Sequence, residues 1–380
     1  MMRIKKLWLT TIAALLCCIT ASAHDFEVDG IYYNIISDAE VEVTYGGDIP
    51  PYVSVSNAYS GRFSNLSIPE TVTNDGKTFH VVSVGGYAFA CCYSLTSVVI
   101  PEGVTSIEDE AFANCGSLTS ITIPESVTTI GDGVFRDTQW YENQPDGIIY
   151  VNKVLLTYKG TMPENTTIEV KEGTVVIAED AFYGCEGLTS ISIPESVISI
   201  GREAFLGTAW YRNQADGMIY AGRVAYEYKG AGDMPENTTI EIKEGIVSIS
   251  SHAFLGGIGL VSVTIPESVV QIGANAFQGC TTLSSINLPR NLTMIGEHVF
   301  DGCCSLVSVV IPDGISKIED RMFRDCSRLT SLILPVSVTS IGDQAFEGCS
   351  SLTDITIPMS VTSIGNQVFW GCSSLTTVHI

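Results

Sequence analysis

The sequence predicts a solenoid, a fold in which short, similar coils stack along one axis. Eleven phenylalanines recur at a regular interval: most are 23 residues apart, and two longer steps of 47 and 49 residues are close to twice that interval. They are Phe89, Phe112, Phe135, Phe182, Phe205, Phe254, Phe277, Phe300, Phe323, Phe346 and Phe369. In such repeats each unit buries its apolar side only against its neighbours. These rings are therefore expected to form one buried spine.

Residues 115–137 show what one coil is expected to contain. Leu118 and Ile121 belong to an apolar run separated by Ser and Thr, which predicts a short strand with one buried face. Pro124 ends that strand, because proline has no N–H to continue a ladder. A second short extended stretch ends at Ile130, and a single helical turn is expected to end at the phenylalanine. Successive coils should pair as parallel strands.

The start of the chain predicts export. Residues 1–23 combine an early basic cluster, an apolar stretch too short to span a bilayer and small residues before position 24, as in a signal peptide. We therefore expect a secreted or cell-surface protein, with the periplasm as the alternative. Residues 24–80 alternate like paired strands and are predicted to form a β-rich cap, since the end of a solenoid core needs covering. Residues 81–380 are predicted to form the solenoid.

The charge of the chain excludes several classes of partner. The chain carries 42 acidic and 19 basic residues, and removing residues 1–23 takes the formal charge from −23 to −26. Such a chain repels phosphate backbones and anionic bilayers, so neither nucleic acid nor membrane insertion is expected. Extracellular proteins and glycans remain as partners.

The cysteines are predicted to be free, buried thiols. Ten of the twelve follow residue 23, and eight stand three residues after a phenylalanine of the series: Cys92, Cys115, Cys185, Cys280, Cys303, Cys326, Cys349 and Cys372. Side chains stacked in this way point in the same direction, which is poor geometry for a disulfide. Buried thiols behave as small apolar groups. Cys91 and Cys304 lie outside this ladder.

Two related insertions account for the two longer steps. They span about residues 138–165 and 208–238, and each contains a Trp-Tyr pair followed by Asp-Gly and alternating apolar residues. This pattern predicts a β-hairpin or a distorted coil. Trp140, Tyr141, Trp210 and Tyr211 are candidates for a recognition patch, because such side chains dominate binding hot spots. The alternative is that they pack beneath the insertion and seal the solenoid.

The repeat resembles a known family. The pattern Cys-x-x-Leu-Thr-x-Ile-x-Ile-Pro-x-x-Val-x-x-Ile-x-x-x-Ala-Phe, seen at residues 326–346 with leucine at 332 and 334, is similar to the BspA-like class of bacterial leucine-rich repeats. The resemblance covers about residues 66–380. It implies a right-handed, curved leucine-rich-repeat solenoid exported to the surface, with adhesion to proteins known for some members. Thr138, Thr208 and Gly257 depart from the pattern at the cysteine position, beside the insertions.

Two rows of side chains are expected to face outward from the strands. The first row, fifteen residues before each phenylalanine, is almost entirely Ser or Thr, whereas the second row, two residues further on, varies. A variable row beside a constant one suits a binding face, and it equally suits relaxed selection at exposed positions. The candidate ligand-binding residues of the second row are Thr122, Ser192, Thr264, Asn287 and Thr356.

A third row, ten residues before each phenylalanine, carries six glutamates: Glu102, Glu125, Glu172, Glu195, Glu244 and Glu267. They are the candidates for a divalent-cation strip, because Ca²⁺ takes several carboxylate oxygens. The alternative is a solvated corner that discourages aggregation. The five histidines are scattered and no catalytic motif is present, so no metal centre, cofactor or catalytic residue is predicted.

These features together predict a non-enzymatic, exported interaction module that adheres to proteins or glycans through the strand face and the aromatic insertions. The alternative is a carbohydrate-active enzyme resembling polysaccharide lyases, which requires basic and acidic side chains converging in a groove. The last coil stops at Ile380 without a visible cap. An uncovered end strand leads us to expect weak self-association there.

Overall fold

The computed structural model describes residues 24–46, 59 and 61–379, so the expected signal peptide lies outside the described residues. The chain divides into two compact units, Met1–Lys159 and Gly160–Ile380. Within each unit, coils of 23 residues repeat the same short strands and turns, with almost no helix. The predicted leucine-rich-repeat solenoid is confirmed.

The first unit begins with strands that lie in the segment predicted to be a cap. Strands β1 (Phe26–Val28), β2 (Ile31–Ile35) and β3 (Glu40–Thr44) pair antiparallel in that order. Strand β6 (Lys77–Val84) then pairs parallel with β3 and antiparallel with β5 (Thr71–Asn74). Because β6 also pairs with the first short strand of the coils, the cap and the solenoid share one sheet.

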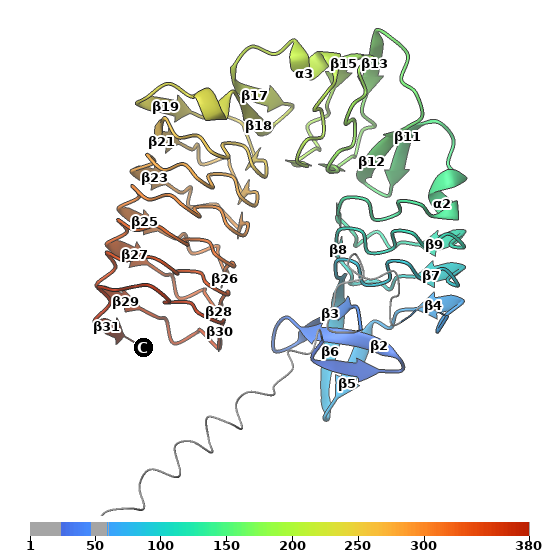
Figure 1. Ribbon diagram of the computed structural model, residues 1–380, viewed down its shortest axis with the longest axis horizontal. Coiled ribbons are helices and arrows are strands. Elements are labelled where there is room, and N and C mark those ends of the chain that lie inside the picture. Colours follow the sequence, from blue (N-terminus) through green and yellow to red (C-terminus); the bar gives the residue numbers. More distant parts are fainter. Residues whose placement is uncertain (1–23, 47–58, 60, 380) are drawn as a thin grey trace, which may run out of the picture. The chain divides into compact units, whose positions relative to one another are not determined.

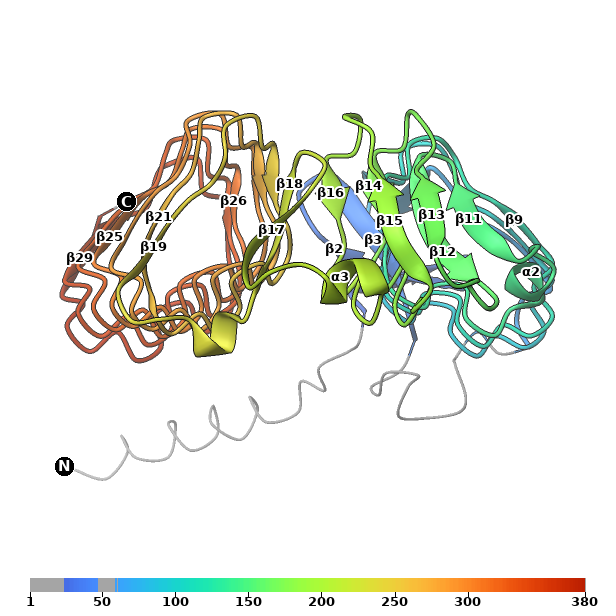
Figure 2. The ribbon, with the colours of Figure 1, turned by 90° about the horizontal axis from the view of Figure 1, so that it is seen from above.

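Each coil contributes a front strand and a back strand, on opposite sides of the stack. In the second unit, Figure 1 shows β21, β23, β25, β27, β29 and β31 following one another on one side and β26, β28 and β30 on the other, and Figure 2 looks along this stack. The front strands are β4 (Asn65–Ser67), β7 (Ser97–Val99), β9 (Ser120–Thr122), β13 (Thr166–Glu169), β15 (Leu188–Ser192), β19 (Thr238–Glu241), β21 (Leu260–Thr264), β23 (Ser285–Asn287), β25 (Ser308–Val310), β27 (Ser331–Ile333), β29 (Asp354–Thr356) and β31 (Thr377–His379).

The back strands are two residues long, because the chain turns at both of their ends. They are β8 (Ser106–Ile107), β10 (Thr129–Ile130), β14 (Val176–Ile177), β16 (Ser199–Ile200), β20 (Ser248–Ile249), β22 (Gln271–Ile272), β24 (Met294–Ile295), β26 (Lys317–Ile318), β28 (Ser340–Ile341) and β30 (Ser363–Ile364). Pairing between coils is parallel with a shift of 23 residues, as between Ser308 and Ser331. Residues 23 positions apart in the sequence therefore lie next to each other on neighbouring coils.

The phenylalanines stack as predicted. In the second unit the ring centroids of Phe277 and Phe300 are 5.8 Å apart, those of Phe300 and Phe323 are 5.4 Å apart, and the planes are nearly parallel. In the first unit the stack runs from Tyr59 through Phe89 and Phe112 to Phe135. Most of these rings are fully buried. The spine is the core around which each unit is built.

The segment around each phenylalanine differs from the expected helical turn. It is a succession of hydrogen-bonded turns, because the residues two before and two after the ring have positive φ, as His298 (55°) and Gly302 (74°) do around Phe300. This backbone turns the N–H of Phe300 toward the next coil, where it donates to the carbonyl of Met322 at 2.9 Å. A continuous helix keeps such hydrogen bonds within itself. In these turns, backbone N–H groups such as that of Phe300 instead form hydrogen bonds with the neighbouring coil.

The cysteine ladder is made of free thiols, as predicted, and it has a hydrogen-bonding role. All ten cysteines of the described residues are free. In the regular coils the thiol donates to the carbonyl of a phenylalanine one coil earlier, as Cys326 does to Phe300 at 3.2 Å. Burial raises the pKa of the Cys280 thiol to about 12. The thiolate is therefore strongly disfavoured, which suits a structural group.

Both insertions contain an antiparallel hairpin preceded by one helical turn. Helix α2 (Gln139–Glu142) precedes β11 (Gly147–Val151) and β12 (Val154–Lys159), and helix α3 (Ala209–Arg212) precedes β17 (Gly217–Ala221) and β18 (Val224–Lys229).

The departures Thr138 and Thr208 are explained by these helices. Thr208 stands at the cysteine position, but it donates to the carbonyl of Phe205 in its own coil, at 2.7 Å. It also accepts from the N–H of Tyr211 as the helix N-cap. Thr138 does the same in the first insertion.

The second insertion is a distorted coil built around its hairpin. Strand β18 pairs parallel with the back strand β20, so it takes the place of a back strand. Tyr226 from β18 meets Phe205 edge to face at 5.3 Å, and Tyr228 lies 6.1 Å from Phe254. These two tyrosines carry the spine across the longer step.

Candidate functional site

The two rows predicted to face outward do so, because strand residues alternate between the core and the surface. In β25, for example, Ser308 and Val310 are exposed and Val309 between them is buried. All five candidate residues of the second row are exposed, one on each of β9, β15, β21, β23 and β29. Thr264 and Asn287 are direct partners on neighbouring strands. The front face is thus a surface made of side chains rather than a pocket.

An apolar patch lies on the front face of the last coils. Val310 and Ile333 are partners in the second row and are 60% and 57% exposed. Val336 and Met359 follow on neighbouring coils at the corner after the strand, and they are 83% and 92% exposed. We call these four residues the apolar corner patch. Sequence reasoning missed it, although the signal was present: after Glu267 the third row continues with arginine and aspartate and then with valine and methionine.

The glutamates of the third row are solvated. All six are exposed, and Glu267 accepts a hydrogen bond from the backbone N–H of Arg290 on the next coil at 2.9 Å. Within the described part of the chain, no three His, Cys, Asp or Glu side chains come close enough together to hold a metal ion. The exposure of all six side chains agrees with the solvated-corner alternative.

The insertion tryptophans pack on the spine. Trp140 and Trp210 are half-buried, each 4.7 Å from the nearest spine ring, Phe135 and Phe205 respectively. This contact agrees with the sealing alternative for the two indoles.

The tyrosines beside the tryptophans are also engaged. Tyr141 lies under the ammonium of Lys159, and Tyr211 under that of Lys229, at 5.2 and 5.4 Å. Lys229 also donates to three carbonyls of the α3 segment, which fastens the helix to the hairpin.

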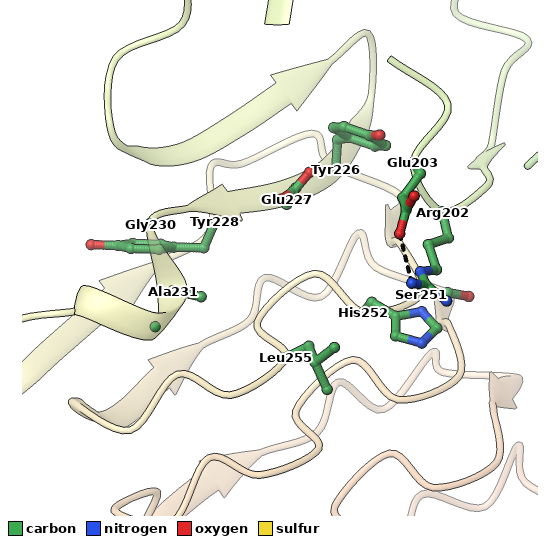
Figure 3. Close-up of a pocket in the computed structure, with 11 residues that line it drawn as sticks. Arg202, Glu203, Tyr226, Glu227, Tyr228, Gly230, Ala231, Ser251, His252 and Leu255 are labelled. Carbon is green, nitrogen blue, oxygen red and sulfur yellow. Dashed lines mark hydrogen bonds and ion pairs between the residues drawn. The ribbon is translucent and has the colours of Figure 1, made fainter. Parts of the chain in front are cut away.

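A pocket opens in the second unit where the second insertion returns to the solenoid (Figure 3). Its volume is about 360 Å³. It is lined by the end of β18, by the short 3₁₀ helix η1 (Ala231–Asp233), and by the turns before Phe205 and around Phe254. We call it the insertion pocket. The polar side chains that line it are Arg202, Glu203, Tyr226, Glu227, Tyr228, Ser251 and His252.

The electrostatics of this pocket follow from partial burial. Burial raises the pKa of Glu227, whose carboxylate accepts from the Tyr211 hydroxyl at 2.8 Å. Burial, assisted by the positive charge of Arg202, lowers the pKa of His252 to about 4, so this imidazole is neutral at physiological pH. Arg202 is paired with Glu203 at 2.6 Å. The donors of Arg202 and the acceptors of Glu203 therefore lie beside one another in the pocket lining.

The chain belongs to the leucine-rich repeat proteins as a class. More particularly, six copies of the BspA type leucine rich repeat region match residues 54–144, 157–213 and 247–376, so the chain belongs to that family. No helix of the described residues has the length and apolar character needed to cross a membrane.

Comparison with solved structures gives similar repeat proteins. A leucine-rich repeat protein from Bacteroides ovatus is 26% identical, with 94% of this chain and 88% of that chain covered and a TM-score of 0.37. One from Eubacterium ventriosum is also 26% identical, with 92% and 94% covered and a TM-score of 0.36. A leucine rich cell surface protein from Faecalibacterium prausnitzii is 24% identical, with 93% and 94% covered and a TM-score of 0.34. None of the curated proteins compared matches the chain.

Proposed function

We propose that this chain is an exported, non-enzymatic interaction protein that binds another protein through the front face of its second unit. Membership of the repeat family supports an interaction role. The signal-like residues 1–23 support a secreted or cell-surface location. A solenoid offers a long surface on which many modest contacts add together.

The apolar corner patch carries this proposal. Val336 and Met359 occupy a position that is glutamate in six other coils, so the fold itself does not require an apolar residue there. Exposing apolar side chains side by side is unfavourable in water and marks a surface that a partner covers. Asp313 and Asp354, both exposed, belong to the same run of coils, and the chain has a formal charge of −23. The partner expected is a protein with an apolar centre and a basic rim.

An enzyme is a poorer fit. A lyase-like site needs free cationic side chains beside carboxylates. In the insertion pocket, Arg202 supplies the cationic group among the lining residues, and it is already paired with Glu203. Ser251 and His252 line the same pocket, but no hydrogen bond joins their side chains in the described part of the chain, so adhesion remains the function we propose.

The test uses the full-length chain against an array of extracellular proteins. The double variant Val336→Glu with Met359→Glu installs the residue that other coils carry at this position, so its melting temperature should stay close to that of the wild type. We expect it to lose at least tenfold in affinity for any partner captured by the wild type. The matched control is Tyr183→Glu, since Tyr183 is exposed but lies outside the patch. Unchanged binding by the double variant contradicts the proposal.

A further inference from the structure

Part of the wall of the insertion pocket is present because the second insertion is two residues longer than the first. Residues 140–160 and 210–230 align one to one, but the first insertion continues with Thr161 before its Met-Pro, whereas the second continues with Ala231-Gly232-Asp233. The added residues form the helix η1, whose Ala231 and Gly232 line the pocket. The chain has thus placed a wall here that its otherwise similar first insertion lacks.

The polar lining is also specific to the second insertion. Tyr226, Glu227 and His252 stand where the first insertion and its following coil have Leu156, Thr157 and Asp180. The second insertion thus carries an aromatic hydroxyl, a carboxylate and an imidazole at positions where the first insertion has other side chains, so the fold does not require these three groups. The two insertions can be compared residue by residue, because each of these three positions has a counterpart 70 or 72 residues earlier in the chain.

One polar atom in the pocket lining has no hydrogen-bond partner. The Nδ1 atom of His252 is buried and has no hydrogen-bond partner among the described residues. A buried polar atom without a partner is costly, so a structure that keeps one calls for an explanation. In Figure 3, His252 and Arg202 lie on one side of the pocket, Tyr228 and Ala231 on the other, and Glu227 and Tyr226 above.

The pocket offers donors, acceptors and an apolar wall together. Glu203 and Glu227 accept, Arg202 donates, and the neutral imidazole of His252 can do either. Tyr228 and the 41% exposed Leu255 supply the apolar wall. A ring face carries negative charge density, to which the polarised C–H groups of a sugar ring are attracted.

We propose that the insertion pocket binds a neutral pyranose sugar, such as one residue of a glycan. A sugar ring has hydroxyls that both donate and accept and an apolar face, which matches this lining. An anion would meet the carboxylates of Glu203 and Glu227, whereas a cation would compete with Arg202 for Glu203. The volume of about 360 Å³ accommodates one or two sugar rings. This site is separate from the apolar corner patch and does not depend on it.

The proposal is tested with methyl glycosides of glucose, galactose, mannose and N-acetylglucosamine. Saturation-transfer NMR and calorimetry on the full-length chain should detect at least one of them, with Kd on the order of 1 mM for a ligand of this size. Acetate and methylammonium serve as charged probes. Failure of every glycoside to bind at concentrations tenfold above that Kd overturns the proposal. So does a charged probe that binds when the glycosides do not.

Two variants locate the site. Glu227→Thr installs the residue found at the matching position of the first insertion, and His252→Asn keeps a side chain that tolerates the positive φ of 62°. Each should weaken glycoside binding at least tenfold while the melting temperature stays near that of the wild type. Glu195→Gln, at an exposed corner outside the pocket, should bind normally. Full affinity in both Glu227→Thr and His252→Asn refutes this location.

Discussion

Replacing Phe300 with alanine tests whether the stacked rings hold the coils together. Phe300 is fully buried and is stacked on Phe277 and Phe323 at 5.8 and 5.4 Å. Truncating a buried phenylalanine typically costs about 3–5 kcal/mol of unfolding free energy through lost transfer energy and the cavity left behind. Loss of two ring pairs, about 0.5–1.5 kcal/mol each, lies within that cost. We expect Phe300→Ala to destabilise its unit by about 4 kcal/mol.

The matched variant is Phe369→Ala. Phe369 is only half-buried and stacks on one neighbour, Phe346, at 5.7 Å. We expect it to lose about 1–2 kcal/mol, because it forfeits less burial and one ring pair instead of two. Phe300→Leu keeps most of the volume and should fall between the two.

The assay is urea unfolding followed by far-UV circular dichroism, with midpoints compared at a common slope. Solenoids can unfold in steps, so the slope of each variant is checked against the wild type before free energies are compared. If Phe300→Ala stays within 1 kcal/mol of the wild type, or costs no more than Phe369→Ala, the rings fill space without supporting the stack.

Three further predictions follow from single contacts. The pKa of His252 is about 4 in the folded protein and about 6.5 in the unfolded chain, so lowering the pH through this range favours the unfolded state. The free energy of unfolding should fall by roughly 1–2 kcal/mol between pH 6.5 and 4, after allowance for partial exposure. Urea midpoints measured across this range should show the fall, and His252→Asn should reduce it. Asp301 is 3% exposed and accepts twice from Arg324, at 3.0 and 2.9 Å, and once from Gln278, at 3.0 Å. Arg324→Ala removes the cationic partner of this buried carboxylate and should cost about 3 kcal/mol in urea unfolding, more than Asp301→Ala; the reverse order would contradict this reasoning. Gly279 has a φ of 71°, and the atom nearest to an added Cβ would lie 3.6 Å away, which is ordinary contact. Gly279→Ala should therefore cost about 1–2 kcal/mol from backbone conformation alone. An unchanged melting temperature would contradict this prediction.

Several elements were predictable because repetition turns one local pattern into many. The alternation around Ile121, the proline that ends the strand and the 23-residue interval were enough to give parallel strands, exposed rows and free thiols. The expected helical turn was wrong in detail. Positive φ is seldom visible in sequence when residues such as Glu203 and His252 adopt it, since glycine is the usual indicator.

The candidate site was only partly predictable. The exposed second row followed from period two, but the roles of neighbouring residues did not. The apolar corner patch was visible as two apolar residues in a row that is polar in the other coils, yet its significance depends on Val336 and Met359 being almost fully exposed. Trp140 and Trp210 show the limit most clearly, because a Trp-Tyr pair in an insertion is equally compatible with binding and with packing.

By itself, the sequence determined the architecture: a period of 23 residues allows just one kind of core, in which identical positions stack, because each coil is too small to bury its apolar face alone. The tertiary structure decided where the regular stack is interrupted by a pocket that is not part of the repeat. The insertion pocket brings together Arg202, Glu227 and His252, which are separated along the chain by one insertion and one coil and share no local pattern. Such convergence depends on how far a loop of two extra residues displaces the chain, and that displacement is set by packing against neighbouring coils.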